Sequence, residues 1–273
     1  MSRPEVTTDA FWEFERAGWE RAAEHYGRWG DTTAFVAALL DATEVESGTR
    51  LLDVACGPGY VSQAAAARGA TPVGLDVAVA MVELARRWYP GLTFVTGDAQ
   101  RLAFADASFE AVTMNFGILH LSEPDRALAE AHRVLARGRR FAFTAWVEEG
   151  NAVAEIVDGA VAAHAVPVTL SEGPPFYRFA DDDECRRTLA DAGFEPGSIR
   201  IETVEAVWRL PTPDLLFEAE LDAGVRTAAV LRAQPAERLQ TIREAMAEGV
   251  RRYADADGFA LPIVARVVSA TRS

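Results

Sequence analysis

The chain has 273 residues, of which 49% are hydrophobic and 25% charged, a composition typical of globular proteins large enough to bury a sizeable core. Its 41 acidic residues outnumber its 27 basic residues and give a formal net charge of −14, so its surface repels nucleic-acid phosphates and anionic membranes. No apolar stretch reaches the roughly 18 residues that span a bilayer, no apolar signal region begins the chain, and the two cysteines indicate no disulfide framework.

These totals predict a cytoplasmic protein whose partner is a small molecule, with neither nucleic acid nor a membrane as a partner. The four histidines show no metal-ligand spacing, so we expect no metal site. The oligomeric state is not predicted.

The N-terminal segment combines a charged helical pattern with a high density of aromatic residues over 11–29. This pattern indicates either a helix that packs against the body of the protein or a lid whose aromatic residues cover a pocket. A second helix is predicted over 31–42, where apolar residues form one stripe.

Short apolar runs bounded by glycine, aspartate or asparagine begin at residue 50 and alternate with helical stretches. Strands and helices at this spacing predict βαβ units and a parallel sheet covered on both faces. The predicted strands are 50–55, 71–76, 92–98, 109–115 and 140–146.

The second half of the chain is less regular. Residues 150–166 and most of 211–255 are predicted to be helical, with the latter helices over one end of the sheet. Residues 181–194 predict a helix with acids at its N-terminus and Gly193 at its end. The alternating pattern of 198–210 and the apolar run 260–272 predict two strands that complete the sheet.

The predicted fold is α/β, a doubly wound, mostly parallel, seven-stranded Rossmann-like sheet with an N-terminal helical lid and a helical insertion near the C-terminus. We divide it into a lid (1–45), a cofactor-binding core (46–147) and a region of acceptor-pocket helices with the last two strands (148–273). The basic runs 86–87 and 137–140 are interpreted as solvated residues at helix C-termini.

The end of the first strand, LLDVACGPGY, is rich in glycine and follows an acid, Asp53. Gly57 and Gly59 permit a close approach to the backbone, and the next helix begins with free N–H groups there. Asp76 and Asp98 end the next two strands, where they are placed to bind ribose hydroxyls and an adenine amino group. One such acid is an ordinary turn residue, but three on successive strand tips favour a ligand site.

These motifs, with VGLDVAVAMVELAR, VTGDAQRLAFADASFEAVTMNFGILHL and HRVLARGRRFAFTAW, resemble the class I S-adenosylmethionine-dependent methyltransferases, in their small-molecule, ubiquinone/menaquinone-type branch. The resemblance covers about 20–147 and implies S-adenosylmethionine as cofactor. It implies as cofactor-binding residues Tyr26, Trp29, Asp53, Ala55, Gly57, Gly59, Asp76, Val77, Met81, Asp98, Ala99, Asn115 and Phe116.

The chain departs from the family pattern at Ala55, where the turn usually begins with glycine. Alanine is small, so binding remains expected, while the backbone path at this position is open. Met81 either supports the adenine or packs in the helix core. In the lid segment, Tyr26 and Trp29 are placed to close over the methionine end of the cofactor.

His120 follows the fourth strand, which in this family faces the transferred methyl group, and is therefore the candidate general base. The alternative is a histidine that caps the following loop or packs in the core. For the acceptor pocket we predict Phe176, Tyr177, Trp208 and Phe217, whose aromatic character suggests a flat, hydrophobic substrate.

The predicted activity is methyl transfer to a small aromatic or heteroaromatic metabolite of the phenol, quinone, indole or amine type, at O, N or C, as in secondary metabolism. Two alternatives remain open from the sequence. One is an NAD(P)-dependent oxidoreductase, since a glycine turn followed by an acid also occurs there. The other is a catalytically silent relative that binds the cofactor without turnover.

Overall fold

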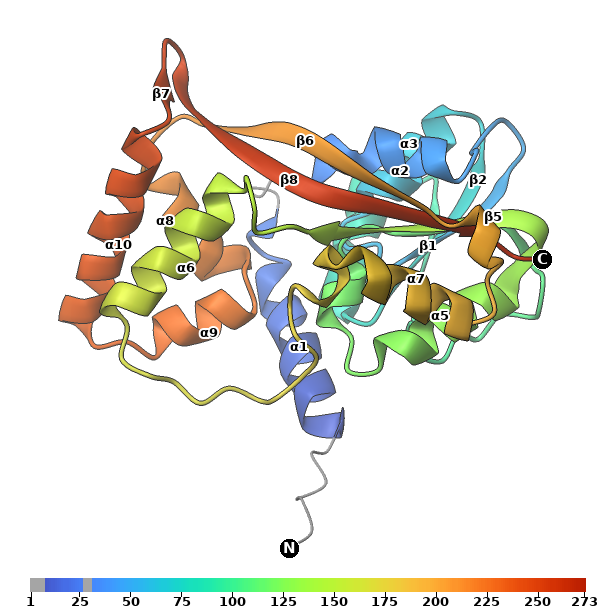
Figure 1. Ribbon diagram of the computed structural model, residues 1–273, viewed down its shortest axis with the longest axis horizontal. Helices are drawn as coiled ribbons and strands as arrows, with labels where there is room; N and C mark the ends of the chain where they lie inside the picture. Colours follow the sequence, from blue (N-terminus) through green and yellow to red (C-terminus); the bar gives the residue numbers. More distant parts are fainter. Residues whose placement is uncertain (1–7, 27–30) are drawn as a thin grey trace, which may run out of the picture.

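The computed structural model describes residues 8–26 and 31–273. Its centre is one sheet in the order β3-β2-β1-β4-β5-β8-β6, and a short β7 pairs with β8 beside this path (Figure 1). The strands are β1 (Arg50–Val54), β2 (Thr71–Asp76), β3 (Thr93–Thr96), β4 (Phe109–Met114), β5 (Leu135–Trp146), β6 (Arg200–Leu210), β7 (Ala254–Asp255) and β8 (Gly258–Thr271). The predicted α/β fold with a doubly wound, mostly parallel sheet is confirmed.

Helices connect the strands and surround them. The α-helices are α1 (Thr8–Ala22), α2 (Val36–Ala42), α3 (Tyr60–Ala67), α4 (Val79–Trp88), α5 (Pro124–Val134), α6 (Ala152–His164), α7 (Asp182–Asp191), α8 (Leu215–Ala223), α9 (Arg226–Arg232) and α10 (Ala236–Arg251). Short 3-10 helices are η2 (Asp31–Phe35), η3 (Gly117–His120), η4 (Arg178–Ala180) and η5 (Pro196–Ser198). No helix in the described part of the chain is both long and apolar enough to cross a membrane.

The strand sequences explain why both faces of the sheet are covered. Neighbouring side chains of β1 point to opposite faces, so Leu51 packs with the residues of α2 and α3, and Leu52 packs into the larger core on the other side. Both leucines are fully buried. Figure 1 shows α2 and α3 on one side of the sheet and α5 and α7 on the other.

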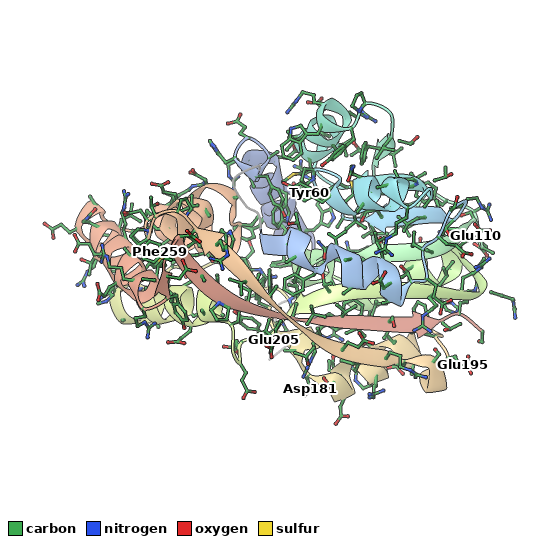
Figure 2. All side chains as sticks on the ribbon, turned by 90° about the horizontal axis from the view of Figure 1, so that it is seen from above. Tyr60, Glu110, Asp181, Glu195, Glu205 and Phe259 are labelled. Carbon is green, nitrogen blue, oxygen red and sulfur yellow. The ribbon has the colours of Figure 1, made fainter. Side chains whose placement is uncertain are left out.

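The last two long strands extend the sheet and carry a group of helices. β8 runs antiparallel to both β5 and β6, and all eleven residues of β6 pair with it. Figure 2 shows β6 and β8 running together from the helices near Phe259 to the opposite end of the sheet near Glu195. Helices α6, α8, α9 and α10 gather at the first of these ends, as predicted for 211–255 (Figure 1).

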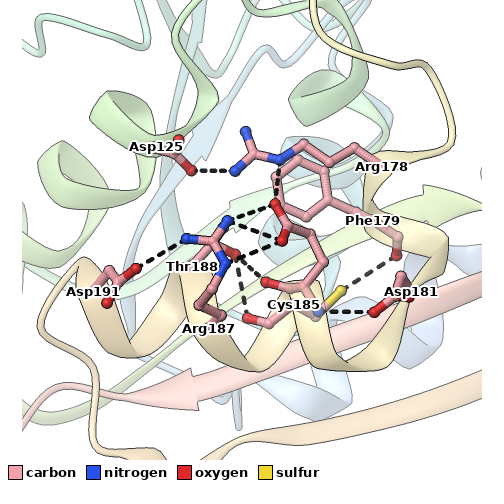
Figure 3. A network of polar contacts seen from close by, with 9 residues as sticks. Asp125, Arg178, Phe179, Asp181, Cys185, Arg187, Thr188 and Asp191 are labelled. Carbon is pink, nitrogen blue, oxygen red and sulfur yellow. Dashed lines mark hydrogen bonds and ion pairs between the residues drawn. The ribbon is translucent and has the colours of Figure 1, made fainter.

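Helix α7 has the predicted terminal residues. The carboxylate of Asp181 accepts a hydrogen bond from the N–H of Glu184 at 2.9 Å, and Gly193 follows the helix with φ of +100°. Arg178 joins this helix to α5, because its guanidinium binds Glu184 at 2.6 Å and Asp125 at 2.8 Å (Figure 3). The ion pairs therefore fix the two helices on this face relative to each other.

The interpretation of residues 137–140 as a helix C-terminus is wrong, whereas residues 137–139 are exposed, as expected. Helix α5 ends at Val134, and these residues belong to β5. The reason is the C-terminal strand: the N–H of Gly138 donates to Arg272 O, and the N–H of Arg272 donates to Arg139 O. These two bonds, together with the pairing of Leu135 with Phe109 of β4, extend β5 toward its N-terminal end, with a register shift against β4. Helix α1 also ends earlier than predicted, at Ala22.

Candidate active site

The turn after β1 adopts left-handed backbone conformations at three positions. Ala55, Gly57 and Gly59 have φ values of +53°, +51° and +91°. A Cβ on Gly57 would meet no heavy atom within 4 Å, so this glycine leaves open space beside the turn. A Cβ on Gly59 would lie 2.7 Å from the ring of Phe94. Gly59 is therefore explained by its backbone conformation and by packing.

Ala55 keeps the backbone path that glycine adopts easily, at a steric cost. Its methyl group occupies space next to Gly117, because a Cβ built on Gly117 would lie only 2.5 Å from the Cβ of Ala55. A second non-glycine residue with positive φ, Phe116 at +58°, lies at the tip of the adjacent strand β4. Two of the four described non-glycine residues with positive φ therefore lie on neighbouring strand tips, where strained backbone is common at functional sites.

The three acids at the strand tips have different surroundings. Asp53 is fully buried behind the turn, where one carboxylate oxygen accepts hydrogen bonds from the N–H and hydroxyl of Ser62 at 3.0 and 2.7 Å. Burial raises the pKa of Asp53 to about 7, although the bonds from Ser62 lower it. Asp53 does not line the cavity described below, so any effect on a ligand passes through the turn.

Asp76 bridges the turn and the next helix from the tip of β2. Its two carboxylate oxygens accept hydrogen bonds from Gly57 N–H at 2.8 Å and from Ala78 N–H at 2.9 Å. Burial raises the pKa of Asp76 to about 6, although these hydrogen bonds lower it. Each carboxylate oxygen has a second lone pair, so Asp76 can still accept two hydroxyl groups. Asp98, beyond β3, accepts the N–H of Gln100 at 2.8 Å.

A cavity of about 370 Å³ opens at the carboxyl ends of β1 to β4, where open α/β sheets bind ligands. Asp76, Asp98 and the turn form one part of its wall, and α1, α6, α8 and the start of α9 form another. Its aromatic lining residues are Trp12, Trp19, Tyr26, Phe116, Trp146, Phe176 and Tyr177. At the far part, Tyr177 donates a hydrogen bond to Asp158 at 3.2 Å. The cavity is therefore largely apolar with a few polar groups.

Helix α1 covers the cavity with one face. Trp12, Glu15, Arg16 and Trp19 all line it, at the spacing of successive helical turns. The helix is held on the core by Glu20, whose carboxylate accepts the first N–H groups of α4 at 2.8 and 2.9 Å. An acid from another helix thus caps α4.

A three-residue network around the buried Glu15 lies where α1, η3 and α9 meet. Glu15 is only 3% exposed and lies 3.0 Å from Nδ1 of His120 through one carboxylate oxygen. Its other oxygen accepts a hydrogen bond from Nε of Arg226 at 2.7 Å. Burial raises the pKa of Glu15, but His120 and Arg226 outweigh burial, and the pKa lies below its ordinary value.

Asn115 and Phe116 shape the cavity wall at the tip of β4. The amide of Asn115 donates to Thr32 O at 3.2 Å and accepts the hydroxyl of Thr144 at 2.8 Å. Phe116 stacks on Trp146, with ring centroids 3.9 Å apart. Both side chains are therefore held in place from neighbouring strands and loops.

The structure brings most of the predicted site residues to one cavity. Those that line it are Tyr26, Ala55, Gly57, Asp76, Val77, Met81, Asp98, Ala99, Asn115, Phe116, His120, Phe176 and Tyr177. Met81 is also 1% exposed and packs against α1, which confirms core packing, while its support of an adenine stays a prediction. Trp29 lies outside the described residues.

Four predicted residues are not among those that line the cavity: Asp53, Gly59, Trp208 and Phe217. Trp208 on β6 and Phe217 on α8 are 6% and 4% exposed and belong to the main hydrophobic core. Their aromatic character reflects packing of the C-terminal helices and strands. The sequence pattern of that region does not separate core aromatics from pocket aromatics.

Sequence reasoning missed Glu15 and Arg226. The available signal was Glu15 itself, an acid on the same helical face as Trp12 and Trp19, because a buried carboxylate among aromatic residues requires a cationic or hydrogen-bonding partner. The partner Arg226 lies far along the chain and had no local signal.

Comparison with known proteins assigns the family. A family profile described as "Methyltransferase domain" matches residues 52–143. The chain is 32% identical over 182 residues to a demethylmenaquinone methyltransferase of Renibacterium salmoninarum, in a match that covers 63% of this chain and 77% of the relative. The chain belongs to the class I S-adenosylmethionine-dependent methyltransferases. This assignment replaces the oxidoreductase alternative.

Further similar proteins agree with this family and with the fold of this methyltransferase. A demethylmenaquinone methyltransferase of Paenarthrobacter aurescens is 32% identical over 198 residues, which cover 68% of this chain and 78% of the relative. A crystal structure of a protein assigned to an antibiotic biosynthesis pathway in Anabaena variabilis aligns with a TM-score of 0.62 at 18% identity, over 87% of this chain and 96% of that one. The latter similarity supports the fold.

The residues at the strand tips fit S-adenosylmethionine, the methyl donor of this methyltransferase. Gly57 leaves open space beside the turn, and Asp76 presents a buried carboxylate with free acceptor capacity at the cavity wall. An adenosyl group needs these two features, an unobstructed backbone turn and an acceptor for two ribose hydroxyls.

Proposed function

We propose that this methyltransferase transfers the methyl group of S-adenosylmethionine to a small aromatic acceptor that carries a hydroxyl group, of the phenol or quinol type. The observation that carries the proposal is the position of His120, which lines the cavity together with aromatic residues from both the sheet and the covering helices. A flat hydroxylated ring matches such walls and presents its proton to a histidine. The names of the relatives, demethylmenaquinone methyltransferases, support a quinone-type ring.

Under this proposal the strand tips hold the cofactor. Asp76 accepts the ribose hydroxyls with Val77 beside it, and Asp98 and Ala99 hold the adenine edge with Met81. The turn from Ala55 to Gly59 backs the methionine part, supported from behind by Asp53, and Tyr26 covers it. Asn115 and Phe116 flank the sulfonium side. When bound, the cofactor supplies a methyl group on a positively charged sulfur, which is already a strong electrophile.

The protein then needs to align the acceptor and remove its proton. Alignment of two reactants supplies up to ~7–11 kcal/mol of a barrier. Phe176, Tyr177 and Trp146 would hold the aromatic ring of the acceptor, and α1, which covers the cavity, would exclude water. His120 would take the hydroxyl proton, a contribution of about 10²–10⁴-fold in rate.

The test combines binding with a product screen. Calorimetry measures S-adenosylhomocysteine binding, and mass spectrometry looks for methylated products from matched phenols, naphthohydroquinones, indoles and aryl amines. We expect products from the hydroxylated rings and a large loss of turnover in His120→Gln, with S-adenosylhomocysteine affinity unchanged. His164→Gln, at the end of α6, is the control.

Three outcomes would reject parts of the proposal. Tight binding with no product from any compound would indicate a catalytically silent relative. Products from indoles or amines alone would reject the acceptor class. Full turnover in His120→Gln would reject the role of the histidine as base. NMR of the product distinguishes methylation at oxygen from methylation at a ring carbon.

A further inference from the structure

The contact between Glu15 and His120 determines which ring nitrogen can act as a base. An ionised carboxylate accepts hydrogen bonds and donates none, so the 3.0 Å contact with Nδ1 of His120 requires a proton on that nitrogen. In the neutral ring only one nitrogen carries a proton. Nε2 of His120 therefore keeps its lone pair.

Arg226 keeps Glu15 in the form that this arrangement needs. The guanidinium binds the second carboxylate oxygen at 2.7 Å and donates to Leu119 O at 2.8 Å. Its carbon atom also lies 4.7 Å from the ring centroid of Phe11 and 5.4 Å from that of Phe176. The arginine is thus fixed on several sides, and its positive charge stabilises the Glu15 carboxylate in a buried position.

The ring of His120 is also held by packing. Trp19 meets it edge-on at a centroid distance of 4.7 Å, and Phe176 does so at 5.9 Å. Within residues 8–26 and 31–273, the hydrogen bond of the ring is the one through Nδ1. Because His120 also lines the cavity, Nε2 is the nitrogen available to an acceptor.

We propose that Glu15 is a positioning residue for His120: it holds the Nδ1 proton so that Nε2 accepts the proton of the substrate hydroxyl, and its negative charge stabilises the imidazolium that results. This inference rests on the proposed function of His120 as the base. The proton would move from the acceptor oxygen to Nε2, and the acceptor would keep the electron pair that bonds to the methyl group. The bond between that methyl group and sulfur would break, and its electron pair would leave with S-adenosylhomocysteine. Because Glu15 lies on α1 and Arg226 on α9, the base is assembled only when both helices are docked.

The isosteric variant Glu15→Gln gives a sharp test. Arg226 can donate only to the amide oxygen, so the amide NH₂ faces His120 and must donate to Nδ1. That nitrogen then carries no proton, and the proton of the neutral ring moves to Nε2. The variant keeps the size and the hydrogen bonds of the network while reversing the tautomer.

The readout is NMR of protein labelled with ¹⁵N-histidine, at pH 9, without acceptor. The chain has only four histidines, so His120→Gln assigns the signal. We expect the Nδ1–H tautomer in the wild type and the Nε2–H tautomer in Glu15→Gln. Glu13→Gln, an exposed acid on the same helix, is the control and should match the wild type. With a phenol that is methylated, kcat of Glu15→Gln should fall at least ~100-fold, with S-adenosylhomocysteine affinity unchanged.

An Nε2–H tautomer in the wild type would overturn the proposal, whether or not the variant folds. An unchanged tautomer in folded Glu15→Gln would overturn it as well. The spectrum needs no acceptor, so a failure of Glu15 is distinguishable from a failure of the proposed reaction, which would show as absence of methylated product with the expected tautomers.

Discussion

Replacing Gly117 with alanine should destabilise the protein through one contact at the cavity. The added Cβ would lie 2.5 Å from the Cβ of Ala55 and 2.9 Å from Cγ of Met114, both shorter than side-chain atoms tolerate. Overpacking of this kind costs about 1–3 kcal/mol of unfolding free energy. The Ala55 contact is the shorter of the two, and Ala55 belongs to the turn, so most of the cost is assigned to this contact.

A double-mutant cycle of Gly117→Ala and Ala55→Gly tests whether the Ala55 contact accounts for most of this cost. Ala55→Gly removes the opposing methyl group and also relieves the left-handed strain at this position, while it adds freedom to the unfolded chain. These two effects nearly cancel, so the single variant should stay within about 1 kcal/mol of the wild type. In the double variant, Gly117→Ala should cost about 1–2 kcal/mol less than it does alone.

Urea unfolding, with the midpoint read at unchanged slope, gives each free energy. Gly159→Ala is the matched control: this glycine lies in α6 with no heavy atom near its missing Cβ, so alanine should stabilise by up to about 1 kcal/mol. Additivity of the two single changes within about 0.5 kcal/mol would refute the idea that Ala55 and Gly117 compete for the same space.

Three further predictions concern carboxylates. Because the pKa of Asp76 is raised to about 6, its ionised form gains population from pH 5 to 7.5, and S-adenosylhomocysteine should bind more tightly over that range. Asp76→Asn should bind ~10-fold more weakly and lose this dependence in calorimetry. Asp53 has its pKa raised from 3.8 to about 7, so its contribution to stability is present below pH 3.8 and is lost as pH rises through 7. Urea unfolding of Asp53→Asn at pH 5 and 8 should no longer show this loss of stability. If the variant shows the same difference in unfolding free energy between the two pH values as the wild type, the burial argument is contradicted. Glu20→Ala should cost about 1 kcal/mol, because the first turn of α4 loses its cap, whereas Glu24→Ala on the exposed surface should cost almost nothing.

The fold was predictable where one local signal dominated. Apolar runs that end in Asp or Asn predicted strands such as β2 and β4 to within a residue, because a short apolar run of this length, closed by a polar residue, is typical of a buried parallel strand. The start of β5 was not predictable from its own residues. The basic run 137–140 has the composition of a helix end, and backbone contacts with β4 and with the C-terminal residues make it part of the sheet.

Site residues were likewise predictable where a local signal marked them. Asp76 and Asp98 were predictable because the carboxyl ends of successive parallel strands meet at one edge. Trp208 and Phe217 were predicted for the cavity and lie in the core instead, because aromatic character alone does not tell which face of an element meets the pocket. Glu15 and Arg226 come from two separate helices, and their meeting is a result of tertiary structure.

The two sides of the cavity are formed by different stretches of the chain. This separation affects how a change of acceptor can arise among such enzymes. The strand tips that are proposed to hold the methyl donor lie within the region 52–143 that the family profile matches, whereas α1, α6, α8 and α9 lie outside it. Under the proposed function, substitutions in those helices would change the acceptor while the donor side stays intact. His120 lies at the junction, so a chimera that exchanges these helices must transfer Glu15 and Arg226 as a pair to keep the contacts that position the proposed base.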